Sequence, residues 1–192
     1  MDGDAGRWRR ARHLGWAGSV SAYLAAMLLQ TLVHTTQAEP TPVPPPPTEQ
    51  AGNPEALAFF ADRDAKADVD SALAAAKISG KTVAIIMGAN WCHDSVGLAG
   101  WLAAPRFMDS MRDRYNIVYV DVGTPQTGKG RNLDIAARFG IKKVKSTPLV
   151  MLVSTDGRLL NSKKDAGSWR NAASRSENAI YRYFAEFAPP AK

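Results

Sequence analysis

The residue best suited to chemistry in this chain is Cys92, the single cysteine among 192 residues. It follows shortly after an apolar segment rich in β-branched residues, 82–87, and precedes apolar residues that recur at helical spacing. A cysteine at such a strand-to-helix turn lies near unpaired backbone N–H groups and the positive end of the helix dipole, which stabilise a thiolate. The position therefore predicts a nucleophilic sulfur. With no second cysteine in the chain, any disulfide chemistry requires a second molecule.

The residues that follow Cys92 allow several interpretations. A protonated His93 would stabilise the thiolate, whereas an anionic Asp94 would destabilise it, so the sign of their combined effect stays open. Asp94 is equally favoured as a helix-start residue without a redox role. Adjacent ligands at a helix start rarely hold a metal ion without a more distant partner, and the other histidines, His13 and His34, lie in the amino-terminal segment. We therefore expect neither a metal site nor a cofactor.

Helix and strand signals alternate around Cys92. Asp68 and Asp70 are capping candidates for a helix that ends at Gly80. The continuous apolar run at 82–87 fits a strand buried on both faces. Helical spacing after Cys92 continues to Pro105, beyond which a second helical piece is expected.

Two further apolar strands are predicted, at 117–122 and 149–153. The glycine-rich segment 123–130 lacks the spacing of a phosphate-binding loop and is interpreted as a surface loop. Residues 133–139 predict a short helix that Gly140 closes. The three strands and their helices indicate an α/β fold.

The carboxyl-terminal part adds a hairpin and a last helix. Asp156 and Gly157 predict a turn into a strand at 158–160, which makes the sheet mixed. Ser174 and Glu177 form a possible capping box ahead of an amphipathic helix. Its apolar stripe consists of Ile180, Tyr183, Phe184 and Phe187.

Two stretches of this sequence resemble thioredoxin. Residues 89–95, Ala-Asn-Trp-Cys-His-Asp-Ser, look like the thioredoxin active-site turn after the first central strand. Phe139-Gly140-Ile141 and then Ser146-Thr147-Pro148, an apolar strand and Asp156-Gly157 resemble the segment that carries the thioredoxin cis-proline. The resemblance covers about residues 68–188. It implies a thioredoxin fold, with a central mixed β-sheet flanked by helices.

The resemblance also implies a substrate site. Pro148 is expected to be cis and to face Cys92, which leaves the backbone of Thr147 free to pair with an extended substrate segment. Trp91 and His93 are expected beside this groove, so the expected substrate-binding residues are Trp91, His93, Thr147 and Pro148. Trp101 and Trp169 are interpreted as core or groove-lining aromatics without a chemical role.

Two departures from the thioredoxin pattern change the expected mechanism. Ser95 occupies the position of the second, resolving cysteine, and its hydroxyl can donate a hydrogen bond to the Cys92 thiolate but cannot displace a mixed disulfide. Ile86 occupies the position where the family commonly has a buried carboxylate that assists the resolving thiol. Cys92 and Ser95 are thus the expected catalytic residues, and the standard two-cysteine cycle is impossible.

Three functions fit these features. In the first, Cys92 forms mixed disulfides with client proteins or small thiols, and an external thiol reductant releases them; the protein is then a monothiol thiol–disulfide oxidoreductase. In the second, the groove beside Pro148 holds extended peptides as a non-catalytic binding or chaperone-type module. In the third, Cys92 is an inert buried thiol in a structural domain.

The amino-terminal region predicts export. Residues 1–38 combine an arginine-rich start, a charge-free apolar stretch and small residues at a cleavage position, which is typical of a signal peptide; an uncleaved membrane anchor is the alternative. Residues 39–53 form a proline-rich linker, and 54–192 form the thioredoxin-like domain. The domain is therefore expected in the periplasm or outside the cell.

The net charge does not indicate a nucleic-acid partner. Four arginines and two aspartates before residue 13 account for two of the six net positive charges. The four net charges of the remaining chain are too few to predict binding to nucleic acid.

Overall fold

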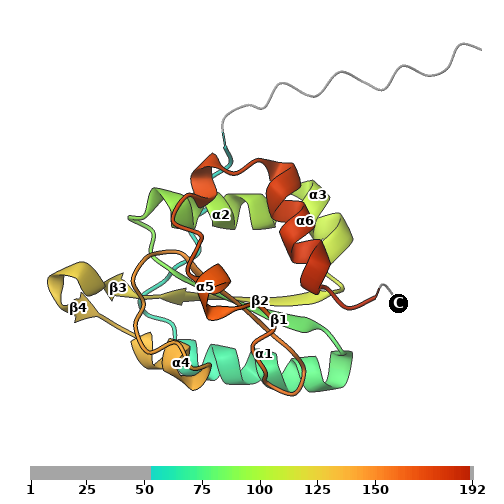
Figure 1. Ribbon diagram of the computed structural model, residues 1–192, viewed down its shortest axis with the longest axis horizontal. Coiled ribbons are helices and arrows are strands. Elements are labelled where there is room, and N and C mark those ends of the chain that lie inside the picture. Colours follow the sequence, from blue (N-terminus) through green and yellow to red (C-terminus); the bar gives the residue numbers. More distant parts are fainter. Residues whose placement is uncertain (1–52, 191–192) are drawn as a thin grey trace, which may run out of the picture. The chain divides into compact units, whose positions relative to one another are not determined.

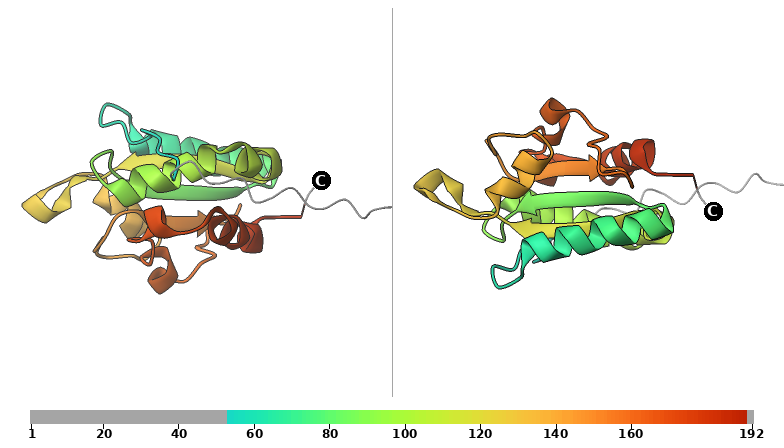
Figure 2. Two further views of the ribbon diagram at one scale, coloured as in Figure 1. Left: turned by 90° about the horizontal axis from the view of Figure 1, so that it is seen from above. Right: turned by 90° about the horizontal axis from the view of Figure 1, so that it is seen from below.

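Strand β1 (Thr82–Gly88) is the centre of the fold, and every one of its residues is buried. It pairs in parallel with β2 (Tyr115–Asp121) and antiparallel with β5 (Leu149–Val153), so the sheet has the order β2-β1-β5 and is mixed. Figure 2 shows β1 between its two neighbours. The structure is a computed structural model that describes residues 53–190. The predicted signal or anchor segment and nearly all of the linker lie outside these residues.

Alternate side chains of β1 point to two separate cores, as the continuous apolar run predicted. Ala84 and Ile86 face a core built with α2 (His93–Ala103), α3 (Pro105–Met111) and α6 (Glu177–Phe187). Val83, Ile85 and Met87 face a core built with α1 (Ala65–Ser79) and α4 (Leu133–Arg138). Figure 1 shows these two groups of helices on opposite sides of the sheet. The architecture is therefore a sheet with helices on both faces, as expected.

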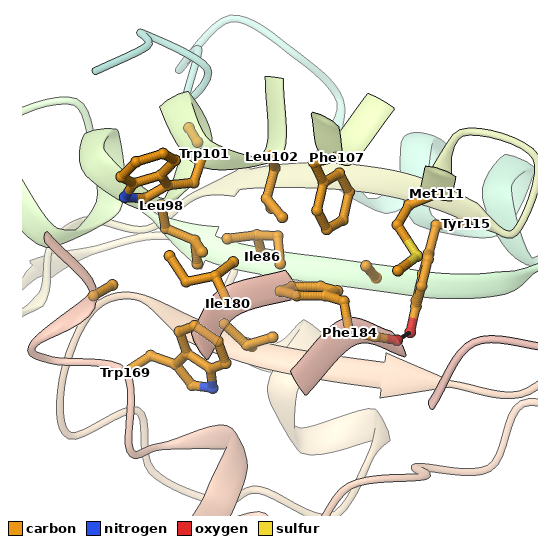
Figure 3. Close-up of a cluster of buried hydrophobic side chains, with 14 of the residues drawn as sticks. Ile86, Leu98, Trp101, Leu102, Phe107, Met111, Tyr115, Trp169, Ile180 and Phe184 are labelled. Atoms are coloured by element: carbon orange, nitrogen blue, oxygen red, sulfur yellow. Dashed lines mark hydrogen bonds between the residues drawn. The ribbon is translucent and has the colours of Figure 1, made fainter. Parts of the chain in front are cut away.

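The first core is rich in aromatic side chains. Figure 3 shows the rings of Trp169 and Phe184 across from residues of α2 and α3. The Tyr115 hydroxyl donates a 2.6 Å hydrogen bond to the Phe184 carbonyl, which ties β2 to α6. Trp101 and Trp169 are both buried, in agreement with their assignment to the core.

Helix α1 (Ala65–Ser79) begins earlier than predicted. Its amino-terminal cap is Asp64, whose carboxylate accepts a 3.1 Å hydrogen bond from the Ala67 amide. Asp68 lies in the first turn and pairs with Arg63 at 2.8 Å, so the expectation that it caps the helix was wrong. The predicted end is confirmed, because Gly80 adopts the left-handed conformation with φ of 79°.

Helix α2 (His93–Ala103) starts one residue after Cys92 and is buried along most of its length. Pro105 begins the next helix, α3 (Pro105–Met111), as expected, since a proline fits the first helical turn. Phe107 and Met111 anchor α3 in the first core. These contacts fix α2 firmly against the sheet and thereby fix its amino terminus.

The glycine-rich segment 123–130, predicted as a surface loop, forms a short β-hairpin. β3 (Gly123–Thr124) and β4 (Lys129–Gly130) pair antiparallel around a short 3₁₀ turn, η1 (Pro125–Thr127), and Figure 2 shows this hairpin projecting beyond the sheet. Helix α4 (Leu133–Arg138) follows, and Gly140 ends it with a positive φ of 78°.

The hairpin predicted after β5 is reduced to a single bridge between Val153 and Leu159. The buried amide of Asn161 takes the place of a fourth strand. Its Oδ1 accepts from the Leu152 amide at 3.0 Å, and its Nδ2 donates to the Val150 carbonyl at 2.8 Å. One side chain thus satisfies backbone groups at this edge that a longer strand would otherwise pair.

Two short helices, α5 (Lys163–Ala166) and the 3₁₀ turn η2 (Ala172–Ser174), lead to the last helix, α6 (Glu177–Phe187). The predicted capping box of Ser174 and Glu177 does not form, because Glu177 is the first residue of α6. Ser176, not Ser174, caps α6 by accepting a hydrogen bond from the Ala179 amide at 3.3 Å. Within residues 53–190, no helix is both long enough and apolar enough to cross a membrane.

Candidate functional site

Cys92 is the amino-terminal cap residue of α2 and is partly exposed. The turn before it is closed by a 3.0 Å hydrogen bond from its own amide to the Ala89 carbonyl. Its carbonyl accepts from the amides of Ser95 and Val96, at 2.9 and 3.0 Å, which starts the helix. Its sulfur makes no capping hydrogen bond to the first turn of the helix.

The Cys92 sulfur meets the loop before β5. The Thr147 hydroxyl donates a hydrogen bond to Sγ at 3.2 Å, and the thiol faces the Thr147 carbonyl at 3.6 Å. The peptide bond between Thr147 and Pro148 is cis, the geometry that the resemblance implied. The fold therefore brings together Cys92 and the loop at 147–148, which are 55 residues apart in the chain.

Thr147 contributes a side-chain donor that the sequence analysis did not anticipate. The expectation concerned only its backbone, which forms no backbone–backbone hydrogen bond within the described part of the chain and so is not committed to the sheet. A hydroxyl that donates to sulfur favours the thiolate, whereas a carbonyl oxygen beside the same sulfur favours the protonated thiol. Both groups come from one residue.

Ser95 does not make the predicted hydrogen bond to Cys92. It is completely buried, and its hydroxyl has no hydrogen-bond partner among residues 53–190. Its Oγ packs so close to Gly88 of β1 that a Cβ at Gly88 would lie 2.6 Å from it. The helix therefore directs Ser95 into the core, and the donor to sulfur is Thr147 instead.

The His93 side chain pairs with Glu55. Its Nδ1 lies 2.7 Å from Oε1 of Glu55, and both side chains are well exposed. The segment that carries Glu55 is held by Asn90, whose Oδ1 accepts from the amides of Ala58 and Phe59. No role was predicted for Glu55 or Asn90; the only signal for Asn90 was a polar residue two positions after a buried strand.

Asp94 has a structural partner. Its Oδ1 accepts a 2.9 Å hydrogen bond from the Ala173 amide, which fastens η2 to the start of α2. The close fit continues at Gly97, where a Cβ would lie 3.2 Å from Ala173. This arrangement supports the interpretation of Asp94 as a helix-start residue.

Trp91 lies on the rim of the site. Its side chain is about half exposed, and its indole N–H donates to the Gly123 carbonyl at 3.0 Å. The bond holds the indole against the start of the β3–β4 hairpin. An exposed aromatic side chain next to Cys92 offers a surface for a client segment.

Ile86 is fully buried in the first core, in the position where the resemblance would place a carboxylate. Across residues 53–190, no group of three or more histidine, cysteine, aspartate or glutamate side chains is placed to hold a metal ion. The arrangement around Cys92 is suited to attack by a single sulfur: one partly exposed thiol, a hydroxyl donor and an uncommitted backbone segment beside it.

Comparisons with known proteins agree with this geometry. Residues 64–154 match a protein-family model described as thioredoxin-like. The structure of a disulphide isomerase from Xylella fastidiosa Temecula1 is 30% identical in sequence, with a TM-score of 0.61. The match covers 68% of this chain and 96% of the isomerase chain. A comparison with curated proteins found no match. The central mixed sheet, the helices on its two faces and these similarities show that the chain belongs to the thioredoxin-like superfamily.

Proposed function

We propose that this protein is an exported monothiol thiol–disulfide exchange protein whose nucleophile is Cys92. The observation that carries the proposal is the 3.2 Å hydrogen bond from the Thr147 hydroxyl to the Cys92 sulfur. Cys92 is the cap residue of α2, which begins with the next residue, His93. Similarity to a disulphide isomerase supports the same chemistry. The proposed clients are exported proteins that carry disulfides or thiols.

The reaction proceeds in two exchanges. The Cys92 thiolate attacks one sulfur of a client disulfide, so that a bond forms to that sulfur, the client S–S bond breaks, and the other client sulfur leaves as a thiolate that takes up a proton. An external thiolate then attacks the client sulfur of the mixed disulfide. Cys92 leaves as a thiolate, and the client sulfur stays bonded to the external thiol. Ser95 takes no part, because a hydroxyl cannot displace a disulfide.

Export follows from the amino-terminal sequence. Cleavage after Ala38 gives a mature chain that begins near Glu39, with a proline-rich spacer before the thioredoxin-like domain. Mass spectrometry of secreted or periplasmic material would find this new amino terminus. Recovery of only full-length, membrane-extracted protein would favour the anchor.

Trapping of mixed disulfides tests the exchange. The wild-type protein is incubated with a disulfide-containing client, and adducts are followed on non-reducing gels. Adducts are expected to persist until an external thiol is added. Ser95→Cys should shorten their lifetime, because the new thiol stands where the resemblance to thioredoxin places the resolving cysteine and can attack the mixed disulfide. Cys92→Ala should form no adduct, since the chain has no other cysteine.

Ser95→Ala is the matched control, because it changes the same buried position without adding a thiol. Its adducts should last as long as those of the wild type. Circular dichroism confirms that each variant is folded. If the folded wild type forms no adducts and Ser95→Cys confers no exchange, the redox proposal fails and the non-covalent peptide-binding module becomes the better account.

A further inference from the structure

A lysine-rich pocket adjoins the loop that carries Thr147. The pocket has a volume of about 770 Å³ and lies between the loop after α4 and helix α5. Five lysines line it: Lys142, Lys143 and Lys145 from the loop, and Lys163 and Lys164 from α5. The hydroxyl of Ser146 donates to the Gly167 carbonyl at 3.3 Å, which holds the loop against the end of α5.

No carboxylate neutralises these lysines. The pocket lining contains neither aspartate nor glutamate, and none of the five lysines forms an ion pair in the part of the chain that the structure describes. Asp165, the acidic residue of α5, is not part of the lining, and its carboxylate accepts a 2.9 Å hydrogen bond from the Tyr183 hydroxyl. The pocket therefore carries a concentrated positive charge without an internal counter-ion.

The pocket also has an apolar component and a defined shape. Ile141 and Leu149 contribute to its lining, and both are largely buried. The ammonium group of Lys163 lies close over Gly140, where an added Cβ would be 2.7 Å from Nζ. A concave surface with apolar and cationic groups suits a side-chain-bearing chain segment better than a flat membrane surface.

The position of the pocket connects it to the thiol. Lys145 and Ser146 come directly before Thr147, whose hydroxyl contacts the Cys92 sulfur. Two residues of extended chain span at most about 7 Å. A client segment whose cysteine reaches Sγ can therefore place residues a few positions away against the lysines.

We propose that this pocket binds an acidic segment of the client, with aspartate or glutamate residues a few positions from the reactive cysteine. The inference rests on the proposed function, because it identifies the class of client that Cys92 attacks. Carboxylates pair with the lysines, and an apolar client side chain packs on Ile141 and Leu149. The pocket then selects clients by charge and orients them beside the sulfur.

The test compares two peptides that differ only in charge. Each contains one cysteine in a disulfide with thionitrobenzoate, and the flanking residues are aspartate and glutamate in one peptide and asparagine and glutamine in the other. Release of thionitrobenzoate reports the rate of attack by Cys92. The wild-type protein should attack the acidic peptide faster, and added salt should reduce the difference.

The informative variant is Lys143→Gln with Lys164→Gln. An exposed ion pair contributes a factor of roughly 1.4 to 5 in affinity, so losing two should lower the acidic-peptide preference at least about twofold. Attack on the neutral peptide should be unchanged. The matched control, Lys66→Gln with Lys77→Gln on α1, removes the same net charge outside the pocket and should keep the preference.

The outcomes separate this inference from the proposed function. Equal attack on both peptides by wild type and variants overturns the acidic-segment proposal and leaves thiol exchange intact. If neither peptide reacts above the Cys92→Ala background, the proposal of thiol exchange fails. Binding of a fluorescent acidic peptide to Cys92→Ala, measured by anisotropy, then tests the pocket separately. The acidic-segment proposal stands only if the lysine substitutions weaken that binding.

Two further arms address other anions. Lysine-dependent binding of anionic phosphatidylglycerol vesicles without any peptide preference would assign the pocket to a lipid surface and overturn the proposal. Lysine-dependent binding of inorganic phosphate, again without peptide preference, would assign it to a free anion and overturn the proposal equally.

Discussion

The contact between Thr147 and Cys92 can be tested by removing a single hydroxyl. Thr147→Val keeps the β-branched shape of the side chain but deletes the donor that lies 3.2 Å from the sulfur. Thr147 is buried, so water is poorly placed to replace the lost hydrogen bond. The Thr147 carbonyl, 3.6 Å from Sγ, remains and continues to favour the protonated thiol.

The expected effect follows from the charge of the acceptor. A hydrogen bond to a charged group contributes about 1.5–3 kcal/mol, and 1.4 kcal/mol corresponds to a factor of ten in an equilibrium. The rate at which the Cys92 sulfur attacks an electrophile should therefore fall about tenfold or more. The helix amino terminus still contributes up to about 1 kcal/mol, so the sulfur should retain some reactivity.

The assay is the rate of alkylation by iodoacetamide, which reacts with the thiolate. At pH 7 the variant should react about tenfold more slowly than the wild type. Equal rates in the two proteins would refute the role of the Thr147 hydroxyl as the donor to the sulfur.

Ser95→Ala is the control, because the Ser95 hydroxyl has no partner in the described chain and should not affect the thiolate. Its alkylation rate should equal that of the wild type. Its free energy of unfolding should be unchanged or higher by about 1 kcal/mol, since an unpaired buried hydroxyl is costly. A slow Ser95→Ala together with a normal Thr147→Val would refute the assignment of the donor.

Two predictions concern stability. Burial raises the pKa of Tyr119 to about 12, whereas the pKa of a tyrosine in the unfolded chain is about 10. The stability that the neutral phenol contributes is therefore complete below about pH 10 and should be lost as pH rises toward 12. Tyr119→Phe should reduce that loss by at most about 3 kcal/mol in urea titrations; an unchanged alkaline loss would contradict this. Asn90→Ala removes the hydrogen bonds that hold Ala58 and Phe59 and should lower the free energy of unfolding by about 3 kcal/mol. The control Asn116→Ala removes one 3.3 Å hydrogen bond to the Ala72 carbonyl and should lower it by about 1 kcal/mol. Equal costs would argue against the anchoring role of Asn90.

The strands were predictable because burial on both faces leaves a distinct pattern. Residues 82–87 contain no charged side chain, and the structure buries all of them. The segment 149–153 behaves in the same way. Gly80 and Gly140 were recognised as helix ends because a residue at positive φ there is most often glycine. These features depend on local sequence, which a single chain reveals.

Features decided by tertiary contacts were not predictable. Asp64 and Asp68 are both acceptable caps for α1, and the same is true of Ser174 and Ser176 for α6, so local preference does not choose between them. The edge of β5 was predicted to pair with a strand. The structure pairs it partly with the backbone of residues 158–160 and partly with the side chain of Asn161, a contact that no spacing rule indicates.

The candidate site was predictable in its position but not in its hydrogen bonds. Resemblance to thioredoxin placed Cys92 beside the loop at 147–148, and the contact between Cys92 and Thr147 agrees with that placement. The direction of the Ser95 hydroxyl depends on how closely α2 packs against Gly88. The orientation of His93 depends on Glu55, which lies 38 residues earlier in the chain.

These hydrogen bonds also limit how a mixed disulfide on Cys92 can be released. Thr147 covers one side of the sulfur, and the completely buried Ser95 carries no nucleophile, so the attacking thiol must come from solvent. The residues on either side of Cys92 in the sequence, Trp91 and His93, have exposed side chains. Release is therefore bimolecular, and its rate should rise in proportion to the concentration of external thiol. In Ser95→Cys, by contrast, part of the release should be independent of that concentration.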